Sequence, residues 1–491
     1  MPFRFRLLAT LGAAGLLWVG FLPGWGWVAW CAAIPFLWAL DGQRGRRGLA
    51  LGALFGVTFF ALEFSSLVSL WPFVGPMVYL VCTALALLGG LFFAAFGLVA
   101  GRWSHPFVWV GAWVLMEALR AAGPLGFTFG SLPAAMAGGP FVPAAATGGP
   151  WLLSLGMVWT TSCVARGVRD RRWWWAAPLG PVILFAMAQV PAGTPEVGSV
   201  TVALVQPNIA KIDQLDPRNL PVQVQVYQDL LGAVPSGVEL VVAPENALPW
   251  LLEEPPYMKL FEDTAQRTGA RVVVGTGVFE EGEVFNTILV LSPTGEVEGS
   301  YAKTRLVPFG ERVPWRDFWT RIGLASLIDP YLPFDQSPGE AIRPVGPLGI
   351  LVCFESTFPG VARELVRQGA QVLITPTNDA WFGRTRILWE HYAWGSLRAA
   401  ETGRSFVQVG QTGISGVWDR RGRELDRLPP WTQGIGIFDV PLHTGLTPYV
   451  RAGDGPVLGL AGLLLIVGVT TQRPRPGRGR GGQLRTTRGR M

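Results

Sequence analysis

Long apolar stretches constrain this chain more than any other feature of its sequence. Eight of them are candidates for membrane-spanning helices, at residues 7–21, 26–40, 48–70, 73–101, 107–119, 151–165, 173–190 and 456–471. A helix needs about 20 apolar residues to cross a bilayer, so the ends of the shorter stretches are approximate. Half of the 491 residues are hydrophobic and only 15% are charged, too few to cover a soluble protein of this size with polar surface. The sequence predicts a polytopic α-helical membrane protein.

The charged residues are distributed unevenly along the chain. Residues 198–440 contain 28 Asp and Glu against 21 Lys and Arg, whereas the remaining residues contain 6 against 19. The basic residues outside 198–440 gather in short clusters between apolar stretches and near the C-terminus. Eight crossings would place all these clusters, and both termini, on the cytoplasmic side of the cytoplasmic membrane. This pattern argues against nucleic-acid binding and predicts that residues 191–454 lie on the periplasmic or outer side.

The segment between the seventh and eighth apolar stretches has a different pattern. Short runs rich in Val and Ile predict strands at 200–205, 238–243, 271–275, 284–291, 349–353 and 372–375, and amphipathic runs predict helices at 221–233, 255–268, 358–368 and 387–402. Such alternation is typical of a layered α/β domain with its site at the carboxyl ends of strands. We therefore expect a membrane domain (1–190), a linker (191–198), an α/β domain (199–440), a connector (441–454), an eighth span (455–472) and a basic, disordered cytoplasmic tail (473–491).

Cys353 is the only cysteine in the predicted α/β domain, because Cys31, Cys82 and Cys163 fall in predicted spans. Residues 349–356 predict a buried strand that runs through Cys353 into a turn and a helix. The field of a helix N-terminus favours the thiolate, which is the nucleophilic form of cysteine. For Cys353 taken alone, a buried and inert thiol is the alternative.

Two further polar residues, Lys303 and Glu245, are candidate site residues. Lys303 lies in a stretch rich in polar and aromatic residues. Lys303 is one of three lysines in a chain with 37 arginines, and a compact ammonium fits beside a developing oxyanion where guanidinium does not. Glu245 directly follows an apolar strand, where burial would raise the carboxyl pKa towards the working pH of a general base. Taken singly, Lys303 could be a surface lysine and Glu245 a helix-capping residue.

Together, Glu245, Lys303 and Cys353 resemble the Glu-Lys-Cys arrangement of the nitrilase superfamily. Eight spans with such a domain between the last two resemble the apolipoprotein N-acyltransferase family. The motifs that carry this resemblance lie at 126–131, 206–209, 244–245, 301–311, 353–355, 378–383 and 398–404. The resemblance implies an exported nitrilase-like αββα sandwich in which Cys353 is the nucleophile, Glu245 the base and Lys303 the stabiliser of the tetrahedral intermediate.

The resemblance also implies roles for residues around this triad. Supporting residues would be Glu311, Glu355 and Asn286, and substrate or lid residues would be Asn378, Trp381, Phe382 and Gly383. The chain departs from the family pattern at Phe354, where a Tyr is usual, at Gln214 and Leu215 in place of a Lys-Trp pair, and at Glu390 in place of a Gln. Gln214 and Leu215 stand where the resemblance implies acyl-chain or headgroup contacts, and Phe354 lacks the usual hydroxyl next to the nucleophile.

The implied reaction transfers an acyl chain in two halves. A phospholipid, with phosphatidylethanolamine as the expected donor, acylates Cys353, and the α-amino group of a diacylglyceryl-cysteine at the N-terminus of an apolipoprotein accepts the chain. We expect a monomer without cofactor or nucleic-acid partner, and no metal site, because the three histidines are not clustered in the sequence. A membrane-anchored nitrilase-class hydrolase that passes the acyl group to water is the nearest alternative. A transporter with an outer binding module is more distant.

Overall fold

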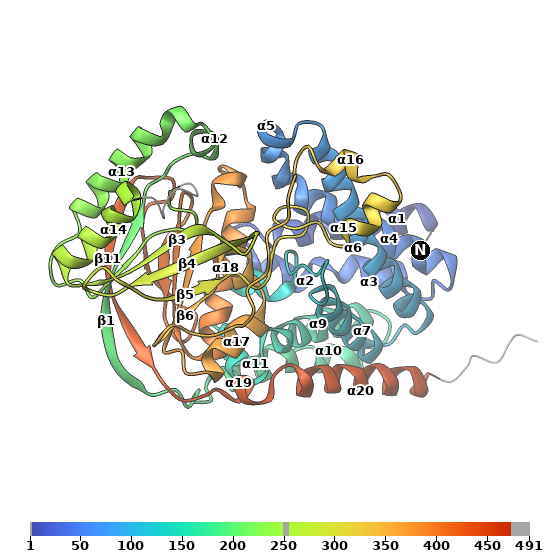
Figure 1. Cartoon of the computed structure of the whole chain (residues 1–491). Helices are drawn as coiled ribbons and strands as arrows, with labels where there is room; N and C mark the ends of the chain where they lie inside the picture. The colour runs from blue at the N-terminus through green and yellow to red at the C-terminus, as the bar shows by residue number, and fades with distance from the viewer. Residues whose placement is uncertain (1, 249–254, 473–491) are drawn as a thin grey trace, which may run out of the picture.

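The computed structural model describes residues 2–248 and 255–472. A helical domain and an α/β domain lie side by side (Figure 1). The helical domain contains α1 (Phe3–Val19), α2 (Ala29–Ala32), α3 (Ile34–Leu40), α4 (Arg46–Glu63), α5 (Trp71–Val74), α6 (Met77–Arg102), α7 (Pro106–Arg120), α8 (Ala145–Gly148), α9 (Pro150–Gly167), α10 (Arg172–Ala176), α11 (Leu179–Ala188) and α20 (Gly455–Thr471). The predicted tail 473–491 lies outside the described residues.

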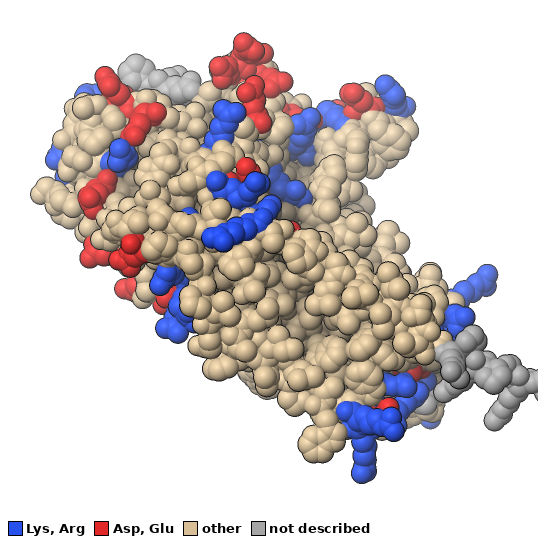
Figure 2. Space-filling model, turned by 90° about the horizontal axis from the view of Figure 1, so that it is seen from below, with Lys and Arg blue, Asp and Glu red and all other residues tan. Residues whose placement is uncertain are grey.

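All eight predicted apolar stretches are largely helical, but they differ in length. Two helical segments within the described ranges are long and apolar enough to cross a membrane, Arg46–Val74 and Met77–Arg102, and two further apolar segments, Gly26–Leu40 and Gly455–Thr471, are shorter. Several helices expose large apolar side chains, among them Leu80, Leu87 and Leu91 of α6 and Leu463 and Ile466 of α20. Figure 2 shows a broad surface almost without charged residues, with Lys and Arg side chains at its end. Such a surface suits contact with lipid tails.

Small residues allow the two longest helices to pack closely. A Cβ atom on Gly52 of α4 would lie 2.0 Å from the carbonyl oxygen of Phe93, and one on Gly97 of α6 would lie 2.3 Å from that of Gly48. Close backbone approach through small residues is typical of helix packing in membranes. Aromatic rings including Phe36, Phe55 and Phe93 fill the adjacent space.

The α/β domain contains two sheets. The first has the order β11-β1-β2-β3-β4-β5 and the second β10-β9-β8-β7-β6. The strands are β1 (Glu196–Gln206), β2 (Leu240–Val242), β3 (Arg271–Glu280), β4 (Glu283–Leu291), β5 (Val297–Ala302), β6 (Leu348–Ile350), β7 (Val372–Thr377), β8 (Ser405–Gly410), β9 (Gly416–Trp418), β10 (Glu424–Arg427) and β11 (Gly434–His443). Strands β1 to β3 run parallel, as do β6 to β8.

Helices cover both outer faces of this pair of sheets. Val202, Val242, Ile350 and Ile374 belong to the apolar core between the sheets. Helices α13 (Leu220–Gly232) and α14 (Pro255–Thr268) pack on the first sheet, whereas α17 (Pro359–Arg367) and α18 (Ile387–Thr402) lie between the second sheet and the helical domain (Figure 1). The shorter helices are α12 (Lys211–Leu215), α15 (Arg316–Arg321), α16 (Ala325–Ile328) and α19 (Pro448–Ala452). The predicted αββα sandwich is confirmed.

The prediction that a strand extends through Cys353 is wrong. Strand β6 ends at Ile350, and Cys353 begins a short 3-10 helix, η6 (Cys353–Thr357). Cys353 has a φ of 52°, in the left-handed region, which a β-strand cannot accommodate. Strands β5 and β8 to β11 were not predicted, since several of them carry exposed polar residues instead of continuous apolar runs.

Buried ionic contacts fasten the α/β domain to the helical domain. Arg386, at the start of α18, forms an ion pair with Glu63 at the end of α4 and another with Glu390, at 3.1 Å. Glu390 also accepts a hydrogen bond of 2.6 Å from the backbone N–H of Gly130. The first turn of α18 is therefore held from the helical side, close to the residues described next.

Candidate active site

The structure brings the three residues of the predicted triad to one end of the sandwich. Glu245 follows β2, Lys303 directly follows β5 and Cys353 follows β6. Carboxyl ends of strands in such sheets are the usual place for functional side chains. Only 4% of Glu245 and 1% of Lys303 is exposed, so their charges interact in a largely water-free environment.

Glu245 lies in a dense set of hydrogen-bond donors. Its Oε1 accepts from Asn286 Nδ2 at 2.6 Å and from Lys303 Nζ at 3.2 Å, and its Oε2 accepts from the Asn378 backbone N–H at 2.8 Å. Burial alone would raise the pKa of Glu245, but the Lys303 ammonium and these hydrogen bonds together lower it. The expectation of a raised pKa is wrong, because a cation and neutral donors surround this carboxylate. In the resting site Glu245 is ionised and can accept a proton.

Lys303 lies between two carboxylates. Its Nζ is 2.8 Å from Glu311 Oε1 and 3.2 Å from Glu245 Oε1. Asn286 Nδ2 donates to both carboxylates as well, at 3.1 Å to Glu311. Burial acts to lower the pKa of Lys303, but Glu245 and Glu311 raise it well above its ordinary value. Lys303 therefore stays an ammonium ion, which can stabilise negative charge.

Cys353 is half-buried and its thiol is protonated at rest. Burial raises the pKa of this thiol well above its ordinary value, and Glu245 adds to the increase, whereas Lys303 opposes it. The expectation that a helix N-terminus favours the thiolate is therefore wrong. The helix η6 has only one turn, whereas desolvation and the nearby carboxylate act directly on the sulfur. Attack by Cys353 requires a base to remove the thiol proton.

Glu355 connects the segments that carry Lys303 and Cys353. Its Oε1 accepts hydrogen bonds of 2.7–3.1 Å from the Tyr301 hydroxyl, the Thr304 N–H and hydroxyl, and the Arg305 N–H. Its Oε2 accepts from the Val352 N–H at 2.8 Å. Glu355 is fully buried, so this side chain fixes the spacing between the turn after β5 and the turn after β6.

Of the four predicted substrate or lid residues, Asn378 contacts the site and Trp381 contacts the helical domain. Asn378 donates through its backbone to Glu245 and through Nδ2 to Gln214, at 3.0 Å. The Trp381 ring packs edge-on against Phe73 of α5, with 5.2 Å between ring centroids. Phe382 is half-buried, and Gly383 is exposed with a φ of 52°. Asn378 thus belongs to the site itself, and Trp381 to its border with the helical domain.

Lys211 was not predicted as a site residue. Its Nζ lies 4.3 Å from the centroid of the Trp381 ring and donates to Gln214 Oε1 at 3.1 Å. Burial lowers the pKa of Lys211 to about 8. Its rarity as one of three lysines is the signal that could have identified it.

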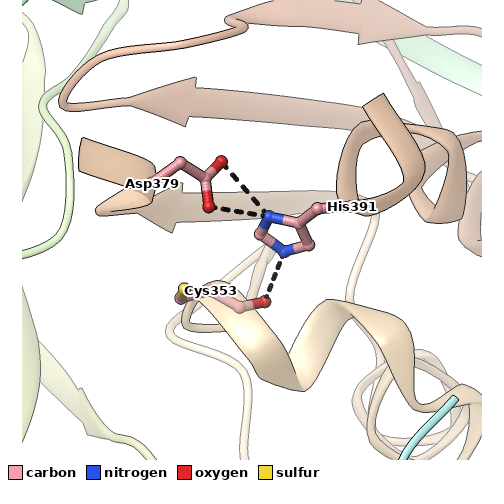
Figure 3. A group of neighbouring side chains, drawn as sticks. All are labelled: Cys353, Asp379 and His391. Carbon is pink, nitrogen blue, oxygen red and sulfur yellow. Dashed lines mark hydrogen bonds and ion pairs between the residues drawn. The ribbon is translucent and has the colours of Figure 1, made fainter. Parts of the chain in front are cut away.

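A His-Asp pair behind Cys353 was also missed (Figure 3). His391 Nδ1 lies 3.0 and 3.2 Å from the two carboxylate oxygens of Asp379. His391 Nε2 lies 3.1 Å from the carbonyl oxygen of Cys353 and 3.0 Å from Ser356 Oγ. Ligand-type atoms of Cys353, Asp379 and His391 lie within 4.8 Å of one another, but both ring nitrogens are already hydrogen-bonded within the protein. Nothing in the spacing of Asp379 and His391 along the chain indicated this contact.

The assembled groups suit acyl transfer through a covalent intermediate. A protonated thiol, an ionised carboxylate and an ammonium converge, which are the elements needed to activate a nucleophile and stabilise a tetrahedral oxyanion. Glu245 and Lys303 are buried and Cys353 is half-buried, and the neighbouring Phe354 stacks on Phe129 of the helical domain. The arrangement therefore fits a substrate with a carbonyl group on a lipid.

Comparison with known proteins accounts for both domains. Residues 201–445 match the family model described as carbon-nitrogen hydrolase, and residues 13–163 match that of the apolipoprotein N-acyltransferase N-terminal domain. The chain is 30% identical to the apolipoprotein N-acyltransferase of Gloeobacter violaceus, over 96% of this chain and 95% of the relative. It is 30% identical to that of Pseudomonas aeruginosa strain PAO1, over 95% of this chain and 83% of the relative.

A solved structure is similar to the α/β domain. An amidase from Nesterenkonia sp. aligns with 55% of this chain and 97% of its own, at 20% identity and a TM-score of 0.37. The full-length relatives extend across both domains at 30% identity. The chain therefore belongs to the apolipoprotein N-acyltransferase family.

Proposed function

We propose that this enzyme transfers an acyl chain from a membrane phospholipid, through a thioester on Cys353, to the α-amino group of the N-terminal diacylglyceryl-cysteine of apolipoproteins. The observation that carries the proposal is the buried cluster of Glu245, Lys303 and Cys353 beside an apolar helical domain. Membership of the apolipoprotein N-acyltransferase family supports the substrate classes.

In the first half-reaction, the Cys353 sulfur attacks the ester carbonyl carbon of the phospholipid. Glu245 takes the thiol proton, and Lys303 stabilises the oxyanion that forms on the carbonyl oxygen. When this intermediate collapses, the ester C–O bond breaks and the proton on Glu245 passes to the leaving alkoxide. The products are a thioester on Cys353 and a lysophospholipid.

In the second half-reaction, the acceptor amine attacks the thioester carbonyl carbon. Glu245 takes a proton from the attacking nitrogen, the C–S bond breaks, and the proton returns to the sulfur of Cys353. The product is an amide. Glu311 and Asn286 hold Lys303 and Glu245 in place during both half-reactions. Glu355 fixes the spacing between the turns after β5 and β6.

Lys211 is the residue that we propose binds the phosphate of the donor, with phosphatidylethanolamine as the expected phospholipid. Its ammonium is only 9% exposed and contacts Trp381, which packs on the helical domain. Its Nζ donates to the neutral Gln214 side chain, and the nearby Glu245 carboxylate only partly offsets the effect of burial on its pKa. A buried cation at this junction favours an anionic ligand. Trp381, Phe382 and Gly383 would then form a lid that excludes water from the thioester.

We further propose the membrane arrangement of the chain. Residues 1–190 form seven spans, 191–198 a linker, 199–440 the catalytic domain, 441–454 a connector and 455–472 an eighth span. The catalytic domain lies on the periplasmic or outer side of the cytoplasmic membrane, with both termini and the tail 473–491 on the cytoplasmic side. The helices over all eight stretches and the position of the basic clusters support this arrangement. The enzyme acts as a monomer.

A membrane-anchored hydrolase would use the same three residues but pass the acyl group to water. The size of the apolar helical domain argues against it, because one helix is enough to anchor a hydrolase. The distinguishing experiment is intact mass spectrometry of the purified enzyme with phosphatidylethanolamine, followed by peptide mapping and addition of a diacylglyceryl-cysteine peptide. We expect an acyl-sized mass on Cys353 that moves to the amine of the peptide. Decay to free fatty acid regardless of peptide would establish the hydrolase, and no adduct would refute the proposal.

A further inference from the structure

His391 and Asp379 form a buried pair that contacts the nucleophile through its backbone rather than its sulfur. His391 is 4% exposed, Asp379 is 1% exposed and Ser356 is fully buried. Figure 3 shows the imidazole between the Asp379 carboxylate and the carbonyl of Cys353, with the sulfur of Cys353 pointing away from the ring nitrogen. Neither residue touches Glu245 or Lys303 through a described hydrogen bond, so the proposed chemical steps do not use them.

The hydrogen-bond partners of His391 determine its protonation. Asp379 accepts only, so Nδ1 carries a proton and donates to this carboxylate. Nε2 faces the carbonyl oxygen of Cys353 at 3.1 Å, which accepts only, and the Ser356 hydroxyl at 3.0 Å, which can donate or accept. An unprotonated Nε2 would place two lone pairs 3.1 Å apart at a buried site, which is costly. The geometry therefore fits an imidazolium ion that donates at both nitrogens.

The carbonyl that His391 holds belongs to a residue with an unfavourable backbone conformation. Cys353 has a φ of 52°, and such a conformation in a residue other than glycine is strained and persists only where neighbouring contacts hold it. The same peptide group carries the N–H of Phe354. A charged donor on the carbonyl withdraws electron density through the peptide and makes this N–H a stronger donor.

We propose that His391, oriented by Asp379, is a positioning residue that holds the Cys353–Phe354 peptide as an imidazolium donor. It keeps the nucleophile in its left-handed conformation and strengthens the Phe354 N–H as a second donor to the oxyanion, beside Lys303. The inference rests on the proposed function, since it assigns His391 to the acylation of Cys353.

The charged surroundings of His391 agree with this role. Burial acts to lower the pKa of His391, but Asp379 on η7 (Asp379–Phe382), its hydrogen bond to the Cys353 carbonyl and the more distant Glu245 raise it overall. Five elements packed on α18, the helices η3 (Leu132–Met136), η4 (Val142–Ala144) and α8 and the strands β8 and β9, contain no charged residue. The buried Glu355 of η6 accepts hydrogen bonds from Tyr301, Thr304, Arg305 and Val352. The charged residues of α17 and α19 have other contacts or are exposed. Arg363 donates to the Val450 carbonyl, Glu364 pairs with Arg367, and Arg451 is exposed. Thr377 donates to Asp379 Oδ1 at 3.1 Å, which fixes the carboxylate.

The competing role for His391 is that of a general base for the thiol, since its ring nitrogen and the sulfur lie within 4.8 Å. The two roles require opposite protonation states. An imidazolium donor loses its function as the pH rises through the pKa of His391, whereas a base loses its function as the pH falls through it. The pH dependence of Cys353 acylation therefore separates them.

The experiment measures the single-turnover rate of Cys353 acylation by p-nitrophenyl butyrate between pH 5 and 9, from the acyl adduct in quenched intact mass spectra. This probe does not depend on phospholipid binding, so its outcome is separate from that of the lipid-transfer experiment. The full-length enzyme in detergent is compared with His391→Gln, Asp379→Asn and the control His443→Gln. His443 is a buried histidine at the end of β11 whose pKa is lowered to about 4 by burial, so it stays neutral throughout.

We expect the wild-type rate to fall at high pH. In Asp379→Asn, which removes the charge that raises the pKa, the fall should move to lower pH. In His391→Gln, whose amide can still donate to the Cys353 carbonyl, the fall should disappear and the rate should be roughly 10–100-fold lower. His443→Gln should keep the wild-type profile. If the wild-type rate instead falls at low pH and this fall is lost in His391→Gln, His391 is a general base and the proposal is overturned. A wild-type pH profile in Asp379→Asn would also overturn it. The Asp379→Asn result decides the question even if His391→Gln does not fold.

Discussion

Replacing Lys303 by Met tests the charge balance of the site most directly. Lys303 is 1% exposed, and its Nζ lies 2.8 Å from Glu311 and 3.2 Å from Glu245. Met removes the charge but keeps a long side chain, which leaves two carboxylates buried without their cation. Removing one partner of a buried pair costs about 3–5 kcal/mol. For a domain of this size that is on the order of 6–10 °C in Tm.

The loss should depend on pH, and its sign follows from the pKa of Glu245. In the wild type this pKa is lowered, so the contribution of Glu245 to stability is present above its unfolded pKa and is lost as the pH falls through the folded pKa. Without Lys303, the effect of burial dominates and the folded pKa rises above the unfolded value. The variant then gains stability as the pH falls, by up to about 1.4 kcal/mol per pH unit for each proton bound.

Thermal unfolding in detergent at pH 5, 7 and 8.5 measures this difference. We expect the gap in Tm between wild type and Lys303→Met to be largest at pH 8.5 and smallest at pH 5. Lys259→Met is the matched control, because Lys259 forms a pair of 2.7 Å with Asp263 on an exposed surface, and its Tm should stay at the wild-type value at each pH. A gap for Lys303→Met that is the same at all three pH values would refute the electrostatic reasoning.

Three further substitutions test other parts of the site. Cys353→Ala should form no acyl adduct and keep its Tm within a few degrees, and an adduct in this variant would place the nucleophile elsewhere. Lys211→Met should raise the KM for phosphatidylethanolamine about tenfold with little change in kcat. In the wild type, kcat/KM should fall above pH 8, because the ammonium is lost as the pH rises through its pKa of about 8, and this fall should be absent in the variant. An unchanged KM would contradict phosphate binding. Arg386→Met should lower the Tm by roughly as much as Lys303→Met, because it removes the contacts with Glu63 and Glu390. Replacement of the exposed Arg218 by Met is the control and should leave the Tm unchanged. Equal Tm values for Arg386→Met and Arg218→Met would show that these buried contacts contribute little.

The sequence predicted those parts of the site that depend on local pattern. Glu245 comes shortly after a predicted buried strand, and a residue at the end of such a strand in an α/β domain lies at a predictable edge. Lys303 was predicted from the scarcity of lysine in the chain, not from β5, which was missed. The strands that were predicted are mostly buried on both faces, such as β2 and β7. Strand β10, with exposed polar residues, was missed because it lacks that pattern.

The sequence could not predict features that depend on contacts between distant segments. Glu63 and Arg386 form their ion pair only because the end of α4 and the start of α18 meet in the fold. His391 reaches the Cys353 carbonyl across 38 positions of the chain. The directions of the pKa shifts are a similar case, since burial and a cation at 3.2 Å act in opposite directions on Glu245. Which effect is larger depends on the distances and hydrogen bonds in the folded site.

The opposite pKa shifts of Glu245 and Cys353 explain how a water-sensitive thioester chemistry can be kept idle. With a low pKa on the base and a high pKa on the thiol, proton transfer from Cys353 to Glu245 is uphill in the resting site. When a carbonyl substrate is attacked, the developing oxyanion interacts with the Lys303 ammonium. Its negative charge partly offsets the effect of that ammonium on Glu245, so the pKa of Glu245 rises. The base becomes stronger as the bond to sulfur forms, so deprotonation is coupled to attack. In the proposed mechanism, the distance of 3.2 Å between Lys303 and Glu245 therefore does more than stabilise the fold, because it makes activation of Cys353 depend on the presence of substrate.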